Sequence, residues 1–145
     1  MKLSYSQIYA LIFGLISAIA ALLMYSLAMK EDWKYLWIYI GLGSTMVAFT
    51  LSYFLLEKND SASNTRRVVV GTLIALLSHW FSWYLLIVVS YIKWEFFGYD
   101  PSFEPFGPLS GLLGAVGLTF FSLVFFGWTS IPISIYLAFR IMQKE

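Results

Sequence analysis

The sequence contains no cysteine and a single histidine, His79. The lack of cysteine excludes disulfides, thiol catalysis, iron–sulfur clusters and zinc sites built from cysteine. One histidine also excludes haem ligation by two histidines of the same chain. Metal sites need several His, Cys or carboxylate ligands close together, and we expect neither a metal site nor a cofactor.

Charge is scarce as well. Charged residues make up 12% of the 145 residues and the net charge is +1, whereas soluble domains carry about twice that share of charge. So few basic residues form no broad basic surface, and nucleic acid is not an expected partner. The length indicates one domain.

Apolar and aromatic residues are abundant instead, at 60% and 20% of the chain. An α-helix rises about 1.5 Å per residue, so about 20 apolar residues cross a hydrocarbon core of roughly 30 Å. Runs of this kind occupy residues 8–29, 36–56, 68–91 and 109–142. We therefore predict an all-α, polytopic integral membrane protein that forms a single bundle of four transmembrane helices.

The first two runs carry stripes of small residues. Ser4 and Gln7 have the spacing of a capping box, which predicts a helix that begins near Tyr5. Small side chains let a neighbouring helix approach closely. The stripes predict packing within this chain, and a dimer face is the alternative. Their members are Ala10, Gly14, Ser17, Ala18 and Ala21 in the first run and Ser44, Ala48 and Ser52 in the second.

The third run has no formal charge between Arg67 and Lys93. At about 100° per residue, its small and polar residues share one sector of the helix. Lipid offers these side chains no hydrogen bonds, so the sector is predicted to face other helices. Its members are Gly71, Thr72, Ala75, Ser78, His79 and Ser82.

His79 lies about 18 Å beyond Arg67 along the helix, close to the bilayer midplane. An ionisable group at that depth is a functional hypothesis, and Ser78, Ser82 and Thr72 would complete a polar site. The alternative is a neutral imidazole bonded to a serine or a backbone carbonyl of a neighbouring helix. None of the predicted spans contains an acidic residue that would serve His79 as a relay partner.

The fourth run is long enough, as a straight helix, to reach about 50 Å. Pro132 removes one backbone hydrogen bond and its ring crowds the Trp128 carbonyl, which predicts a kink. The run is therefore one long kinked helix, or residues 109–119 form a separate interfacial piece.

The segment 92–108 is predicted to be the longest loop, rich in aromatic residues and prolines. Glu95, Asp100 and Glu104, together with Trp94, are candidates for contact with a divalent cation or a basic partner. The alternative is a solvated acidic loop at the membrane surface.

Lysine and arginine set the orientation of a membrane protein. With both ends in the cytoplasm, six of the nine basic residues lie inside and three outside. We therefore expect cytoplasmic termini. The inside set is Lys2, Lys58, Arg66, Arg67, Arg140 and Lys144, and the outside set is Lys30, Lys34 and Lys93.

Enzymatic chemistry is not expected, because paired carboxylates occur only in predicted loops and no base stands beside a nucleophile and an acid. We expect a protein that contacts another integral membrane protein through its helices, as an accessory subunit, a regulator or an immunity protein against a pore-forming toxin. We expect the protein to lie in a bacterial inner (plasma) membrane. The alternative is a small oligomeric channel or transporter with His79 in a polar path.

Overall fold

The computed structural model describes residues 3–28, 35–58, 63–97 and 106–142. These residues form four α-helices and no strand, and the last five residues of the second span are π-helical. All four spans are long and apolar enough to cross a membrane, as the sequence predicts. The elements are α1 (Tyr5–Ala28), α2 (Leu36–Ser52), η2 (Tyr53–Glu57), α3 (Asn64–Phe97) and α4 (Pro108–Ile141).

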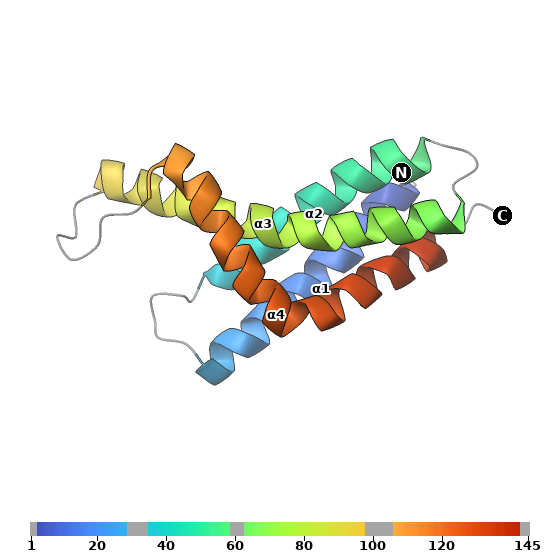
Figure 1. The fold of residues 1–145 in the computed structure, drawn as a ribbon, viewed down its shortest axis with the longest axis horizontal. Coiled ribbons are helices and arrows are strands. Elements are labelled where there is room, and N and C mark those ends of the chain that lie inside the picture. The colour runs from blue at the N-terminus through green and yellow to red at the C-terminus, as the bar shows by residue number, and fades with distance from the viewer. Residues whose placement is uncertain (1–2, 29–34, 59–62, 98–105, 143–145) are drawn as a thin grey trace.

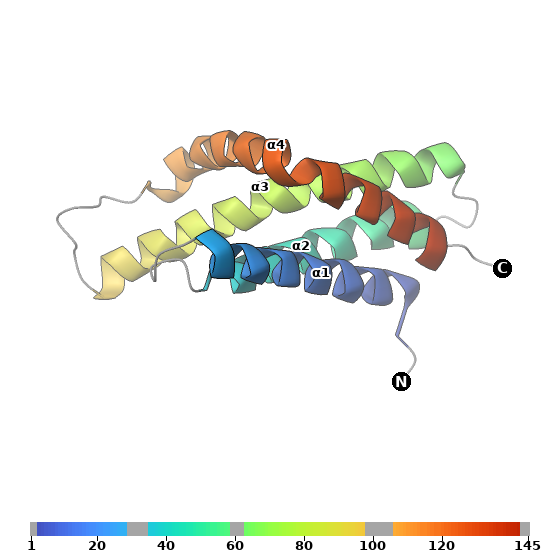
Figure 2. The ribbon, with the colours of Figure 1, turned by 90° about the horizontal axis from the view of Figure 1, so that it is seen from below.

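The helices form two layers, with α1 and α2 in one and α3 and α4 in the other (Figure 2). Contacts are extensive within each layer and between α2 and α3, but sparse between α1 and α4. Figure 1 shows the beginning of α1 and the end of α4 at the same end of the bundle. Towards the opposite end, α1 and the first part of α4 diverge.

The predicted capping box forms at the start of α1. The Ser4 N–H donates to Gln7 Oε1 at 2.9 Å, and the Gln7 N–H donates to Ser4 Oγ at 3.3 Å, so the helix begins at Tyr5. The carboxylate of Glu57 accepts hydrogen bonds from both the N–H and the hydroxyl of Ser6. A helix N-terminus favours a negative charge, so the carboxylate is well placed there. The contact ties the end of η2 to the start of α1.

Close helix approach within the chain accounts for the small-residue stripe of α1, as predicted. A Cβ atom added to Gly14 would lie 3.0 Å from the Gly41 carbonyl oxygen of α2. The other layer has the same kind of contact, since a Cβ atom on Gly71 would lie 2.8 Å from Ile135 Cα of α4. Glycine therefore sets the distance between the helices in both layers.

The fourth run forms one helix, and residues 109–119 belong to it rather than to a separate piece. Figure 1 shows α4 in two arms that meet at an angle where its colour turns from orange to red. Pro132 lies inside the helix, so the Trp128 carbonyl lacks its usual donor four residues on. The predicted kink is therefore present, and the first arm of α4 points away from α1.

The prediction of a loop from residue 92 onward was wrong for its first six residues. Residues 92–97 continue α3 to Phe97, so α3 has 34 residues, about 50 Å in length. No glycine or proline interrupts this stretch before Gly98. The ammonium group of Lys93 lies 5.7 Å from the centroid of the Tyr35 ring, which joins the extended helix to the start of α2.

Candidate functional site

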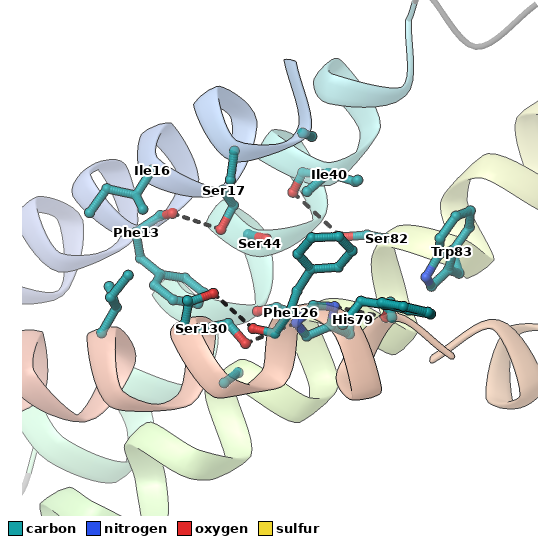
Figure 3. A pocket seen from close by; sticks show the side chains of 18 of the residues that line it. Phe13, Ile16, Ser17, Ile40, Ser44, His79, Ser82, Trp83, Phe126 and Ser130 are labelled. Atoms are coloured by element: carbon teal, nitrogen blue, oxygen red, sulfur yellow. Dashed lines mark hydrogen bonds between the residues drawn. The ribbon is translucent and has the colours of Figure 1, made fainter. Parts of the chain in front are cut away.

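A cavity of about 470 Å³ lies beside the middle of α3, and all four helices contribute residues to its wall (Figure 3). Its walls are mainly apolar, with hydroxyl groups and one imidazole among aromatic rings. Each helix contributes to the lining because α1 and the first arm of α4 diverge beside the α2–α3 contact. The labelled lining residues are Phe13, Ile16, Ser17, Ile40, Ser44, His79, Ser82, Trp83, Phe126 and Ser130.

His79 is held by two serines of α4. Its Nδ1 lies 2.9 Å from Ser122 Oγ and its Nε2 lies 3.0 Å from Ser130 Oγ. The Ser122 hydroxyl donates to the Thr119 carbonyl at 3.1 Å. Because the Ser122 hydroxyl is used as a donor to Thr119, the proton in its bond with His79 comes from Nδ1, and a second hydrogen bond joins Nε2 and the Ser130 hydroxyl. Both ring nitrogens of His79 are therefore hydrogen-bonded within this chain.

The two serines stand two helical turns apart on α4, which is about 12 Å along a straight helix. Through them His79 ties the middle of α3 to two positions on α4 that lie ahead of Pro132. This is the bonding expected of an imidazole that joins neighbouring helices. No acidic side chain is among the described residues that line the cavity with His79.

Two of the serines singled out with His79 share its cavity wall. The Ser82 hydroxyl donates to the Ile40 carbonyl of α2 at 3.4 Å. Ser78 is only 3% exposed, and its hydroxyl has no hydrogen-bond partner among the described residues. Thr72 does not line the cavity, and its hydroxyl donates to the Val68 carbonyl of its own helix at 2.9 Å.

The candidate contact residues of the segment 92–108 are not brought together with this site. Trp94 and Glu95 lie in the last turns of α3 rather than in a loop, and neither lines the cavity. Glu95 is exposed and Trp94 is half-buried. Asp100 and Glu104 lie outside the residues that the structure describes.

Sequence reasoning missed a second polar connection at the end of the bundle that holds the start of α1. Tyr9 is fully buried, and its hydroxyl lies 2.6 Å from Ser134 Oγ and donates to the Ser134 carbonyl at 3.0 Å. The Ser134 hydroxyl in turn donates to the Gly71 carbonyl at 2.7 Å. The inward orientation of Ser134 was predictable from its spacing along the helix. Nothing in the sequence distinguishes Tyr9 as a buried residue from the many other aromatic residues.

The one base in the described cavity wall, His79, is held by two hydroxyls, and no acidic side chain lies in that wall. In the part of the chain that the structure describes, no three His, Cys, Asp or Glu side chains gather into a metal site. Neither models of protein families nor curated proteins nor solved structures match this chain.

Proposed function

We propose that this chain is a non-enzymatic membrane protein that acts through lateral helix contacts with another integral membrane protein. The observation that carries the proposal is the uncovered first arm of α4. Leu109 is 83% exposed, Leu113 79% and Phe120 70%, and Trp128 near the bend is 81% exposed. The arm lies beside α3 and stands apart from α1, so most of its circumference is free of this chain.

The buried positions of the arm are all small. Gly111, Ala115 and Ser122 form a narrow line, which lets α3 come close and leaves the larger side chains on the outside. By contrast, α1 buries Tyr9 and Phe13 against its neighbours. The outward face of leucine and phenylalanine is thus left for lipid or for the helix of a partner.

The polar groups of the arm are satisfied locally. The Thr119 hydroxyl donates to the Ala115 carbonyl at 2.7 Å, and the Trp128 indole N–H donates to the Val124 carbonyl at 3.1 Å. The arm therefore needs no polar partner to rest in hydrocarbon. Contact with another membrane protein would rest on packing, which suits an accessory subunit, a regulator or an immunity protein that meets the helices of a pore-forming toxin.

The His79 bonds favour this function over transport through a polar path. Both ring nitrogens are engaged by Ser122 and Ser130 of the same chain. A proton relay or an ion path would need at least one of them to exchange partners. An imidazole that holds two helices together fits a bundle whose work is done on its outer surface.

Photo-crosslinking in the native membrane tests the proposal. A photoreactive amino acid at Leu113 or Phe120 on α4 is expected to give a covalent adduct with a second protein. The matched control is Leu42 on α2, which is 56% exposed but lies on another helix. Adducts with lipid alone at the α4 positions would contradict the proposal. An adduct that contains only two copies of this chain would contradict the claim that the partner is another protein.

A further inference from the structure

The cavity lies in the space that α1 and α4 leave between them. The hydrogen bonds between Tyr9 and Ser134 close one end of this space, and Ile133, the residue before Ser134, lines the wall there. Away from this end, α1 and the first arm of α4 diverge (Figure 1). On α2 the lining reaches Leu36, the first residue of that helix. The cavity therefore extends from the Tyr9–Ser134 pair towards the start of α2.

The cavity opens between α1 and α4. Its exposed lining residues all belong to these two helices, whereas the lining residues of α2 and α3 are buried or half-buried. Both α1 and α4 are long and apolar enough to cross a membrane, so the opening lies on the lipid-facing flank of the bundle. The exposed lining residues are Ala20, Leu118, Phe121, Phe125 and Thr129.

The wall presents an almost wholly apolar surface to an occupant. None of the described lining residues is Asp, Glu, Lys or Arg. The Ser17 hydroxyl donates to the Phe13 carbonyl of its own helix at 2.9 Å, and the Thr129 hydroxyl donates to the Phe126 carbonyl at 3.0 Å. Both ring nitrogens of His79 are bonded to serines of α4. Because these polar groups are engaged within the chain, the wall favours a hydrocarbon over a polar or charged ligand.

The length and volume of the cavity suit one acyl chain. Its lining covers residues 13–21 of α1, 36–44 of α2 and 75–83 of α3, about 12 Å along each helix. One leaflet of the hydrocarbon core is about 15 Å thick, half of the roughly 30 Å of the whole core. An apolar cavity of about 150 Å³ binds benzene, with its six carbon atoms. By the same measure, a volume of about 470 Å³ has room for roughly eighteen carbon atoms.

A partner helix does not fit the same space. An α-helix with its side chains is about 10–12 Å across, so 12 Å of its length would fill roughly 1,100 Å³. That is more than twice the cavity volume of about 470 Å³. The lipid that surrounds the bundle is then the available occupant. An acyl chain in the cavity gains dispersion contacts with a wall that would otherwise have no partner atoms.

We propose that the cavity binds one acyl chain of a phospholipid from the surrounding bilayer, which enters between α1 and α4. The chain supplies contacts that α1 and α4, whose mutual contacts are sparse, do not make with each other. The site does not rest on the partner proposed above. That partner would meet Leu113 and Phe120, which do not line the cavity, whereas the acyl chain lies against Phe121 and Phe125, which do.

The test is native mass spectrometry of the full chain, extracted from its membrane in mild detergent and washed extensively. Ala20→Phe places a ring at the opening of the cavity. The matched control is Ile19→Phe, which adds the same ring at the neighbouring position, exposed and outside the cavity wall. About one phospholipid per chain is expected in the wild type and in the control. Its occupancy should fall at least about tenfold in Ala20→Phe, because the ring displaces two or more methylene groups.

A phospholipid with a photoreactive group on its acyl chain tests the site without a substitution, so the test holds even if Ala20→Phe fails to fold. The chain is incubated with this lipid, washed in detergent and then irradiated. Crosslinks are expected at Ile16 and Phe126, which line the cavity and are half-buried. Leu15, which is 62% exposed and lies outside the cavity wall, should not be labelled once loosely bound lipid has been washed away.

Loss of all phospholipid from the wild type on washing, or equal occupancy in all variants, would overturn the proposal. Labelling at Leu15 as strong as at Ile16 would mean that lipid binds only to the outer surface, and would overturn it as well. A free fatty acid or a detergent molecule in place of the phospholipid would contradict the bilayer lipid as the source. A protein found in the cavity in its place would make the space a groove for a partner.

Discussion

The Tyr9 hydroxyl lies 2.6 Å from the Ser134 hydroxyl and joins α1 to α4 at the end of the bundle where α1 begins. Contacts between these two helices are otherwise few. Beyond this pair the helices part, and the cavity occupies the space between them and the α2–α3 contact. The pair therefore fixes the point from which the bundle opens.

Tyr9→Phe removes the hydroxyl that bonds Ser134 and keeps the ring. Interhelical hydrogen bonds in membranes contribute about 0.6 kcal/mol on average and up to about 1.7, and we expect a loss in the upper half of that range because the pair is buried. The measurement is the free energy of unfolding in mixed micelles. The control is Tyr136→Phe, where the hydroxyl meets Arg140 at the surface, and little change is expected. An equal loss of unfolding free energy in both variants would contradict the claim that the Tyr9 hydroxyl stabilises the bundle.

Gly71→Ala should destabilise the chain by about 1–3 kcal/mol, because the added methyl group would meet the backbone of Ile135. Gly117 in the first arm of α4 is the matched control, since a Cβ atom there would have no neighbour within 4 Å. Gly117→Ala should be neutral or stabilise by up to about 1 kcal/mol through helix propensity. The stability changes of both variants are measured by thermal unfolding in detergent. A neutral Gly71→Ala would mean that α3 and α4 are not in close contact there.

His79→Leu leaves Ser122 and Ser130 without their imidazole partner, and we expect it to destabilise the chain by about 1–3 kcal/mol. Ser130→Ala combined with it forms a double-mutant cycle. The expected coupling is about 0.5–1.5 kcal/mol, because each residue loses the same bond. A chain that unfolds as the wild type does but loses a transport activity would instead assign His79 to a polar path.

Much of this structure follows from patterns within single helices. The four spans, the capping box of Ser4 and Gln7 and the kink ahead of Pro132 each depend on neighbours in the sequence. The inward polar sector of α3 follows from helical periodicity and the poor solvation of hydroxyls in lipid.

Contacts between helices were not predictable, because they depend on how far one helix slides and tilts against the next. One interpretation of the sequence gave His79 a serine or a backbone carbonyl as its partner, but it did not predict that Ser122 and Ser130 bond the ring together. Thr72 shares a sector with Ser78, yet lies too far along α3 to reach the cavity. The extension of α3 to Phe97 was missed because its aromatic and charged residues resemble those of a surface loop. The lack of glycine and proline before Gly98 is the signal that favours a continued helix.

The orientation is a further prediction. The absence of cysteine allows single cysteines at Ser61 and Ser102, in the connections before and after α3, to be labelled without background. With cytoplasmic termini, Ser61→Cys should react with an impermeant thiol reagent only after the membrane is opened, and Ser102→Cys in intact cells. Labelling of both from the same side would contradict four spans, and the reverse pattern would contradict the orientation.

The most direct test of the proposed function is the mass and composition of the complex that the tagged chain forms in its native membrane. The chain is extracted in mild detergent, alongside a variant with Leu113→Ala and Phe120→Ala on α4 and a control with Leu42→Ala and Met46→Ala on α2. We predict a second membrane protein in fixed stoichiometry with the wild type and the control, lost or reduced in the α4 variant. A chain that purifies alone, or only as copies of itself, in all three preparations would contradict the account.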